Sequence, residues 1–289
     1  MEGDALRHAA DVAAGIAREA GAIIRANFAA PRRIATKSAP VDLVTDTDRA
    51  ADALISRRLR EAFPGDLLVT EEGGARSAEA GSPPPGRAPL HWVVDPLDGT
   101  TNFAHGLPQF AVSIAAVAGL DPRDPIAADS ARRGRALVGI VYDPMRDELF
   151  RATVEEPATC NGERIATTAE GEAGACLVTT GFPYDRREQV DLYLRSFREM
   201  MLRCRDVRRI GAAALDLAWV ACGRVDAFWE WGLKPWDVAA GTLLVRRAGG
   251  RTSDFAGRDP GVDARQTLAT NGPVHEALVG ILGGLDGHG

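Results

Sequence analysis

The chain has 289 residues, 45% of them hydrophobic, so it can bury the core of one large domain or of two smaller ones. Its 40 acidic and 34 basic residues give a formal net charge of -6, and neither sign gathers into a tail or stripe, so we expect no nucleic acid partner. There is no signal-peptide pattern and no apolar run of membrane-spanning length, which predicts a cytoplasmic protein with no membrane partner.

The first half of the chain predicts two helices and several short strands. Apolar residues recur at helical spacing over residues 4–28 and 47–63. Short runs rich in Val and Leu end in acidic residues, as buried strands can. These runs cover residues 42–46, 66–72 and 90–95. Residues 111–119 and 136–144 are predicted as neighbouring strands, joined by an exposed loop over 120–135 that is rich in Pro, Asp and Gly.

In the second half, predicted strands and helices alternate, which is typical of an α/β arrangement. Helical patterns cover residues 188–204, 211–223 and 235–250, and strand patterns cover 174–182 and 225–231. The change of pattern near Thr153 to Pro157 predicts an N-terminal α+β domain over residues 1–154 and a C-terminal α/β domain over 155–289. The two halves are expected to share an interface.

The stretch "WVVDPLDGTTNF" predicts two converging carboxylates. A strand is expected to end at Asp95, and Pro96 then turns the chain so that Asp98 faces the same space. Two carboxylates buried together repel each other, and a divalent cation removes that repulsion. Hard oxygen ligands favour Mg²⁺ or Mn²⁺, and the carbonyl of Leu97 is free to be a further ligand.

The residues that follow suggest a place for an anion. Gly99 lets the backbone approach closely, and the next residues resemble a helix start whose free N–H groups can receive a phosphate. The alternative is an ordinary type I turn, because Asp-Pro and Asp-Gly are common turn residues. That alternative is weakened by three further acidic clusters at element ends, which are Asp46 with Asp48, Glu71 with Glu72, and Asp237.

Two of these motifs, "DPLDGTTNF" and "WDVAAG", resemble the signatures of the inositol monophosphatase family, within the metal-dependent, lithium-sensitive phosphatase superfamily. The resemblance runs from about Lys37 to Gly250 and includes "VTDTD", "TEEGG", "TGFPYD" and "GAAALDLAWVACGRVDAFWE" in the family's order. It implies a layered αβαβα sandwich of the inositol monophosphatase and fructose-1,6-bisphosphatase type.

The resemblance also implies a set of metal ligands. Glu71, Asp95 and the Leu97 carbonyl would hold one Mg²⁺, and Asp95, Asp98 and Asp237 would hold a second. A third, weaker Mg²⁺ would lie near Glu71 through water, and Mn²⁺ could substitute for Mg²⁺. The ions would neutralise the charge of a phosphate monoester and activate the attacking water.

Catalytic roles are implied for Glu71, Asp48 and Thr100. In the family, the residues that match Asp48 and Thr100 orient and deprotonate the attacking water. For Asp48 the competing interpretation is a helix N-cap, and both roles together are consistent with the sequence. The backbone N–H groups of Gly99 and Thr100 would hold the phosphate oxygens.

Substrate contacts are implied for Asp98, Ala213, Glu230 and Asp237. Many relatives read "GTAA" or "GSAA" where this chain has "GAAA", so Ala212 removes a side-chain hydroxyl at this point. Glu230 is alternatively an exposed charge at a strand end. The arginine-rich run over residues 205–209 is interpreted as a solvated face, or alternatively as a contact for a second substrate phosphate.

The function expected from these residues is Mg²⁺-dependent hydrolysis of a small phosphate monoester, with myo-inositol 1-phosphate first. Fructose 1,6-bisphosphate, histidinol phosphate and a 3′-phosphonucleotide are alternatives, because fold and metal site do not fix the leaving group. The rival from another class is a noncatalytic regulatory binding protein on the same fold. Family resemblance further implies a homodimer and sensitivity to lithium.

Overall fold

The structure is a computed structural model and describes residues 3–28, 34–36, 43–76, 89–121 and 123–285. The helices are α1 Gly3–Phe28, α2 Asp46–Ala62, α3 Thr100–His105, α4 Ala128–Arg133, η1 Ala173–Ala175, α5 Val190–Arg203, α6 Ala213–Ala221, α7 Pro235–Arg247 and α8 His275–Leu282. The strands are β1 Ile34–Thr36, β2 Leu43–Thr45, β3 Leu67–Thr70, β4 Gly74–Arg76, β5 His91–Asp98, β6 Ala111–Ala118, β7 Arg135–Asp143, β8 Glu148–Thr153, β9 Thr159–Cys160, β10 Glu163–Arg164, β11 Leu177–Thr180, β12 Asp206–Arg208, β13 Ala227–Trp231, β14 Arg251–Ser253 and β15 Gln266–Thr270.

The larger sheet has eight strands in the order β10-β9-β8-β7-β6-β5-β3-β4. Its central strands are buried on both faces, because successive side chains alternate between two cores. Val94 and Ile114 pack towards α1 and α2, whereas Val93 and Ala115 pack towards α6 and α7. The strands that carry the predicted acids are therefore fixed from both sides.

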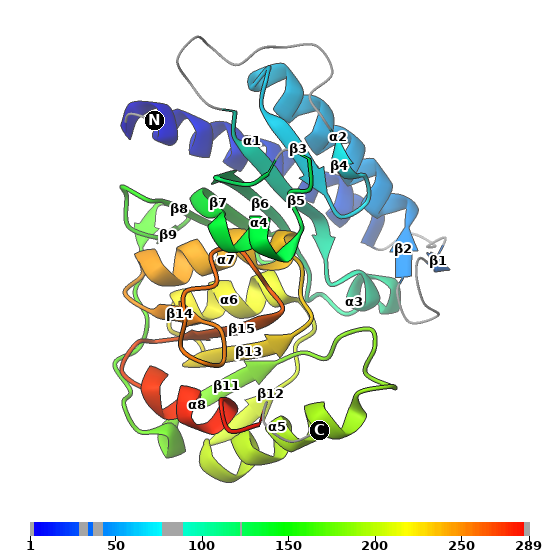
Figure 1. Ribbon diagram of the computed structural model, residues 1–289. Coiled ribbons are helices and arrows are strands. Elements are labelled where there is room, and N and C mark those ends of the chain that lie inside the picture. Colours follow the sequence, from blue (N-terminus) through cyan, green and yellow to red (C-terminus); the bar gives the residue numbers. More distant parts are fainter. Residues whose placement is uncertain (1–2, 29–33, 37–42, 77–88, 122, 286–289) are drawn as a thin grey trace.

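The smaller sheet has five strands in the order β12-β11-β13-β15-β14. Helices α6 and α7 lie between the two sheets, and α5 and α8 cover the outer face of the smaller one (Figure 1). A helix between two sheets must be apolar on most sides, and α7 is buried at every residue from Val238 to Val245. The layers are thus αβαβα, which confirms the predicted architecture.

The two halves of the chain share one core between the sheets. This core joins Val93 and Ala115 of the first half to Leu217 and Leu244 of the second. The expected interface is present, and the division into residues 1–154 and 155–289 stays a prediction. Within the predicted loop over 120–135, the segment "ADSARR" forms helix α4, because neither Gly nor Pro interrupts it between Pro125 and Gly134.

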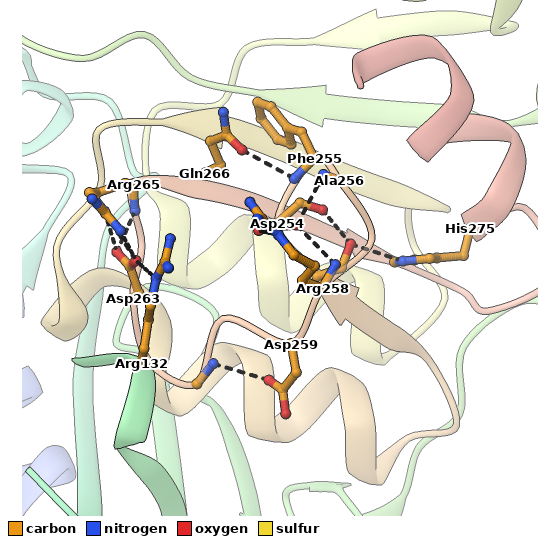
Figure 2. Close-up of polar contacts among 12 residues, drawn as sticks. Arg132, Asp254, Phe255, Ala256, Arg258, Asp259, Asp263, Arg265, Gln266 and His275 are labelled. Carbon is orange, nitrogen blue, oxygen red and sulfur yellow. Dashed lines mark hydrogen bonds and ion pairs between the residues drawn. The ribbon is translucent and has the colours of Figure 1, made fainter. Parts of the chain in front are cut away.

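Helix α4 is tied to the segment after β14 by charged side chains, which Figure 2 shows. Asp263 accepts hydrogen bonds from Arg132 at 3.1 Å and from Arg265 at 2.7 Å, and Asp254 accepts one from Arg258 at 2.7 Å. We call these five residues the 254–265 ion-pair group. Each of the two carboxylates in the group has at least one guanidinium partner, so neither negative charge is left uncompensated.

Candidate functional site

The end of strand β5 brings two aspartates to one side of the sheet. Asp95 pairs with Ser113 of β6, and Asp98 pairs with Ala111. Three residues of β5 therefore span the same length as two residues of β6, which defines a β-bulge. Pro96 lies within the bulge and has no N–H to donate. Residues three apart on a regular strand face opposite sides of the sheet, and the bulge brings Asp95 and Asp98 to the same side. The strand continues through Asp98, so the prediction that it ends at Asp95 was wrong.

Four carboxylates share this space, and we call them the acid cluster: Glu71, Asp95, Asp98 and Asp237. Burial raises the pKa of Asp95 well above its ordinary value, and the charges of the other three raise it further. Burial also raises the pKa of Asp98 to about 7, although the Ala214 N–H opposes this by donating a hydrogen bond at 2.7 Å. Burial and the charges of Glu71 and Asp98 hold the pKa of Asp237 well above its ordinary value. Like charges are therefore concentrated at one point.

The neighbouring backbone sets this cluster in place. The Glu71 N–H donates to the carbonyl of Val94 at 3.1 Å, which fixes the end of β3 beside the end of β5. Asp237 lies in the first turn of α7 and accepts a hydrogen bond from the Lys234 N–H at 2.7 Å. Ser113 holds the start of α7 against β6 by donating to the carbonyl of Trp236 at 3.0 Å.

The chemistry of these donors fits a divalent cation. Carboxylate oxygens and a backbone carbonyl are the hard ligands that Mg²⁺ and Mn²⁺ prefer, and a cation would relieve the repulsion that raises the pKa values. Within the described residues, no three His, Cys, Asp or Glu side chains form a group that could already hold a metal ion. The fit therefore rests on donor type and charge. The acid cluster and the carbonyl of Leu97 are the groups that would hold the ions.

Asp48 and Thr100 are in direct contact. The Thr100 hydroxyl lies 2.7 Å from Asp48 Oδ1 and 3.0 Å from the carbonyl of Leu97, so its one proton has two acceptors. The other oxygen of Asp48 accepts from the backbone N–H of Thr45 at 2.9 Å and from the Thr45 hydroxyl. Thr45 is the N-cap of α2, and Asp48 completes a capping box three residues later. The N-cap is therefore Thr45 and not Asp48, which lies three residues further along the chain.

The loop after β5 has the backbone that the phosphate hypothesis needs. Gly99 has φ of 92°, and a Cβ atom there would lie 2.8 Å from the carbonyl oxygen of Gln109, so only glycine fits without strain. Helix α3 begins at Thr100, and the first N–H groups of any helix lack partners within it. The proposed role of Gly99 and Thr100 in holding a phosphate remains a prediction.

On the far side of Asp98 lies the segment before α6. The N–H groups of Ala213 and Ala214 both donate to Asp98, so the amide predicted to contact the substrate is here engaged by the acid cluster. Glu230 is only 7% exposed, which rules out the alternative of an exposed strand-end charge. Burial, and then the charge of Asp216, raises the pKa of Glu230 well above its ordinary value.

Two charged residues near the site, Asp216 and Arg209, were not predicted to belong to it. Asp216 is 1% exposed, and burial raises its pKa well above the ordinary value, whereas a hydrogen bond from Thr179 and the charge of Arg209 lower it. The signal was a single acidic residue within the apolar helical run "GAAALDLAWVACG". Arg209 was assigned to a solvated face, yet its charge acts on Asp98, Asp216 and Glu230.

Two further residues and the lengths of the helices complete the description of the site's surroundings. His105, which follows the proposed phosphate loop, is exposed. Lys37 lies outside the described residues. Within the described ranges, none of the helices combines the length and the hydropathy that crossing a bilayer requires.

Comparison with known proteins places this site in a family context. The sequence model of the inositol monophosphatase family matches residues 5–283. The chain is 42% identical over 270 residues to the Nus factor SuhB of Escherichia coli K12, which covers 93% of each chain. Its structure is similar to the extragenic suppressor protein suhB of Bartonella henselae, with a TM-score of 0.81, 34% identity and 94% and 97% of the two chains covered. It is also similar to an inositol monophosphatase of Anabaena (Nostoc) sp. PCC 7120, with a TM-score of 0.80, 36% identity and 96% of each chain covered.

These relatives correct one prediction. The expectation of no nucleic acid partner is contradicted, because relatives at this level of identity are named Nus factor SuhB. The expectation rested on net charge, and net charge reports only broad electrostatic attraction. It says nothing about a local surface that joins a larger assembly.

Proposed function

Because this chain belongs to the inositol monophosphatase family, we propose that it is a Mg²⁺-dependent phosphomonoesterase whose substrate is myo-inositol 1-phosphate. The observation that carries this proposal is the acid cluster. Its buried carboxylates raise one another's pKa values, and such like-charge groups mark functional sites. Bound Mg²⁺ would supply the positive charge that offsets the phosphate and polarises the attacking water.

Thr100 and Asp48 form the proton path of the proposed reaction. The Thr100 hydroxyl can accept a proton from the attacking water as it passes its own proton to Asp48, 2.7 Å away. Asp48 is held by the Thr45 hydroxyl and N–H, so its free oxygen stays directed at Thr100. Glu71 completes the proposed catalytic set beside Asp95.

The remaining groups position the ester. In this proposal the N–H groups of Gly99 and Thr100 hold the phosphate without moving, as preorganised dipoles. Glu230 and Asp237 accept hydrogen bonds from the hydroxyls of the leaving group, together with Asp98. The Ala213 amide contributes through its hydrogen bond to Asp98.

The test is phosphate release with and without Mg²⁺ from four esters: inositol 1-phosphate, fructose 1,6-bisphosphate, histidinol phosphate and 3′-phosphoadenosine 5′-phosphate. We expect Mg²⁺-dependent release with the highest kcat/KM for inositol 1-phosphate. Preference for another ester would change the proposed substrate and leave the proposed mechanism unchanged. No release from any of the four would contradict the phosphatase proposal.

The names of the relatives favour a second function, and we propose that the chain also acts as a Nus factor. The two functions separate by mutation, because Asp98→Asn removes a metal-site charge and leaves the surface unchanged. We expect RNA polymerase from the same organism to be retained equally by immobilised wild type and by this variant. Absence of retention by both would contradict the second function.

A further inference from the structure

A cavity of about 380 Å³ lies where helix α4 meets the segment between β14 and β15. The five residues of the 254–265 ion-pair group line it, together with Trp231 and Pro260 among others (Figure 2). Small-molecule sites commonly have volumes of about 300 to 1,000 Å³. The cavity is therefore large enough for a small ligand, and its described lining contains no member of the acid cluster.

Asp263 holds two arginines at one side of this cavity. Both of its oxygens accept hydrogen bonds from Arg265, and Oδ2 also accepts one from Arg132 Nε at 3.1 Å. A guanidinium group that is held through Nε alone keeps its two terminal amino groups for other partners. Within the described residues, the terminal nitrogens of Arg132 donate to no protein group, so they are available to a ligand.

Asp254 holds a further arginine in the same manner. Its Oδ2 accepts a hydrogen bond from Arg258 Nε at 2.7 Å, and its Oδ1 accepts from the backbone N–H groups of Ala256 at 3.0 Å and Arg258 at 2.9 Å. The carboxylate thus fixes both the turn and the guanidinium group that the turn carries. Arg258, too, has terminal nitrogens that donate to none of the groups in the described part of the chain. Two arginines from separate segments therefore bring unused donors to one cavity.

The backbone keeps α4 in place beside the rest of the cavity wall. The Val262 N–H donates to the carbonyl of Ala131 at 2.9 Å. Gly261 has φ of 66°, and a Cβ atom there would lie 2.4 Å from the carbonyl oxygen of Arg132, so this close approach needs glycine. The arginine at the end of α4 is thus preorganised, which reduces the cost of ordering it around a ligand.

The unused hydrogen-bonding groups of the cavity carry positive charge. The third aspartate of the lining, Asp259, accepts a hydrogen bond at 2.8 Å from Arg246, which is not part of the lining. Arg132 and Arg265 share the single carboxylate of Asp263, which leaves one positive charge in excess. A ligand that supplies oxygens and negative charge suits such a lining, because guanidinium groups bind oxyanions through charge-assisted hydrogen bonds.

The donors favour a terminal phosphate group over other oxyanions. Each guanidinium group offers a fork of N–H groups that matches two oxygens of one anion. A carboxylate has only two oxygens, and a phosphodiester has only two that are not esterified, whereas a phosphate monoester has three and a larger charge. A phosphate group fills only part of the cavity, and Trp231 and Pro260 give the rest of the molecule an apolar wall.

We propose that this cavity binds a small organic phosphate through Arg132 and Arg258, with the terminal phosphate between the two guanidinium groups. The site is separate from the acid cluster and does not depend on the proposed phosphatase activity. The ligand joins α4 to the turn after β14, and it stabilises the folded chain because the unfolded chain has no such cavity.

The test is calorimetric titration of inorganic phosphate into the metal-free protein at constant ionic strength and about pH 8, where phosphate is mainly a dianion. Without metal the acid cluster repels phosphate, so the reaction centre does not compete. We expect saturable binding by wild type and a Kd raised at least about tenfold in Arg132→Gln and in Arg258→Gln, since each loses a charge-assisted pair. Arg132→Lys should recover only part of the affinity, because an ammonium group keeps the charge and loses the fork.

Arg58→Gln is the matched control. The Arg58 side chain is 43% exposed against 49% for Arg132, and it is likewise bonded to a carboxylate, that of Glu19, but it lies on α2. Its loss should leave the Kd for phosphate within about twofold of wild type, because it removes one charge far from the cavity lining. Dimethyl phosphate distinguishes a terminal phosphate from a nucleic acid backbone. As a diester with one charge, it should bind at least about tenfold more weakly than inorganic phosphate.

Thermal unfolding provides a second measurement. Phosphate should raise the unfolding temperature of wild type and of Arg58→Gln, but not that of Arg132→Gln or Arg258→Gln. The two arginines lie in different segments, so either variant tests the site if the other fails to fold. The inference is overturned by any of three results: no phosphate binding by metal-free wild type, the same Kd in the cavity variants as in Arg58→Gln, or equal binding of dimethyl phosphate.

Discussion

Asp98 of the acid cluster and Asp263 of the 254–265 ion-pair group have similar solvent exposure, but their pKa values are shifted in opposite directions. Asp98 in the acid cluster is 9% exposed, and Asp263 in the 254–265 ion-pair group is 8% exposed. Burial and the charge of Glu71 raise the pKa of Asp98 to about 7. Burial would raise the pKa of Asp263 too, but hydrogen bonds from Arg265 and Arg132 lower it (Figure 2).

Burial is the largest cause of the raised pKa of Asp98, whereas hydrogen bonds from two arginines outweigh burial at Asp263, so the two carboxylates differ in their neighbours as well as in their depth. The ion-pair group is complete within the chain, so its charges stabilise the contact between α4 and the segment after β14. The acid cluster lacks such balance and opposes folding until a proton or a cation arrives. Burial alone does not mark a functional carboxylate, whereas burial among other carboxylates does.

Asp98→Asn should have the largest effect on activity. It removes a charge from the acid cluster without changing shape, so we expect kcat for inositol 1-phosphate to fall at least about 10³-fold. In EDTA the same variant should unfold at a higher temperature than wild type, because one like charge is gone. Steady-state kinetics and thermal unfolding measure the two effects. A kcat near that of wild type would remove Asp98 from the metal site.

Thr100→Val tests whether the acid cluster needs a specific proton path in addition to charge. The variant loses the hydroxyl that contacts Asp48, so kcat should fall about 10²-fold while KM stays within about twofold. Thr100→Ser keeps the hydroxyl and serves as the control. Equal kcat values for the Val and Ser variants would show that the Thr100 hydroxyl takes no part in proton transfer.

Asp263→Asn is the matched change in the ion-pair group. It should leave kcat unchanged and lower the free energy of unfolding by about 1–2 kcal/mol, because the two arginines lose a charged acceptor. Chemical denaturation measures the difference. An Asp263→Asn protein as inactive as Asp98→Asn would erase the distinction between the two groups.

The pH dependence of the metal-free protein should separate the groups more finely. Between the ordinary aspartate pKa of about 4 and the value of about 7 in the folded chain, Asp98 holds a proton only when folded. The stability that this proton gives is complete below about pH 4 and is lost as pH rises through about 7. Asp263 has a lowered pKa, so its contribution is lost only as pH falls below about 4. Thermal unfolding in EDTA from pH 5 to 8 should therefore show a falling midpoint that flattens in Asp98→Asn. An equal slope in both proteins would contradict this.

The sequence predicted the layers and the acids because both have local signatures. Helical spacing marked α1 and α2, and acidic residues at strand ends marked Glu71, Asp95 and Asp98. The roles of these residues and the substrate remain proposals. The family was predicted from the motifs "DPLDGTTNF" and "WDVAAG" and not from periodicity, and the match to the family's sequence model confirms it.

The features that were missed depend on tertiary contacts. The β-bulge at Pro96 forms because β5 stays paired with β6 on both sides of it. The residues of a turn motif do not reveal this pairing with a second strand. Asp216 and Arg209 matter through neighbours that are distant in the chain, and the room for Arg209 depends on Gly211. The expectation about nucleic acid failed because an assembly partner leaves no trace in net charge.

The most direct test of the metal site is calorimetric titration of Mg²⁺ into the metal-free protein at about pH 6.5, in two buffers that differ in ionisation enthalpy. Wild type is expected to bind Mg²⁺ and release protons, because the acid cluster must ionise to hold the ion. Asp98→Asn should bind at least about tenfold more weakly and release fewer protons, whereas Asp263→Asn should match wild type. No Mg²⁺ binding by wild type, or the same binding and proton release in Asp98→Asn, would contradict the claim that these carboxylates form a metal site.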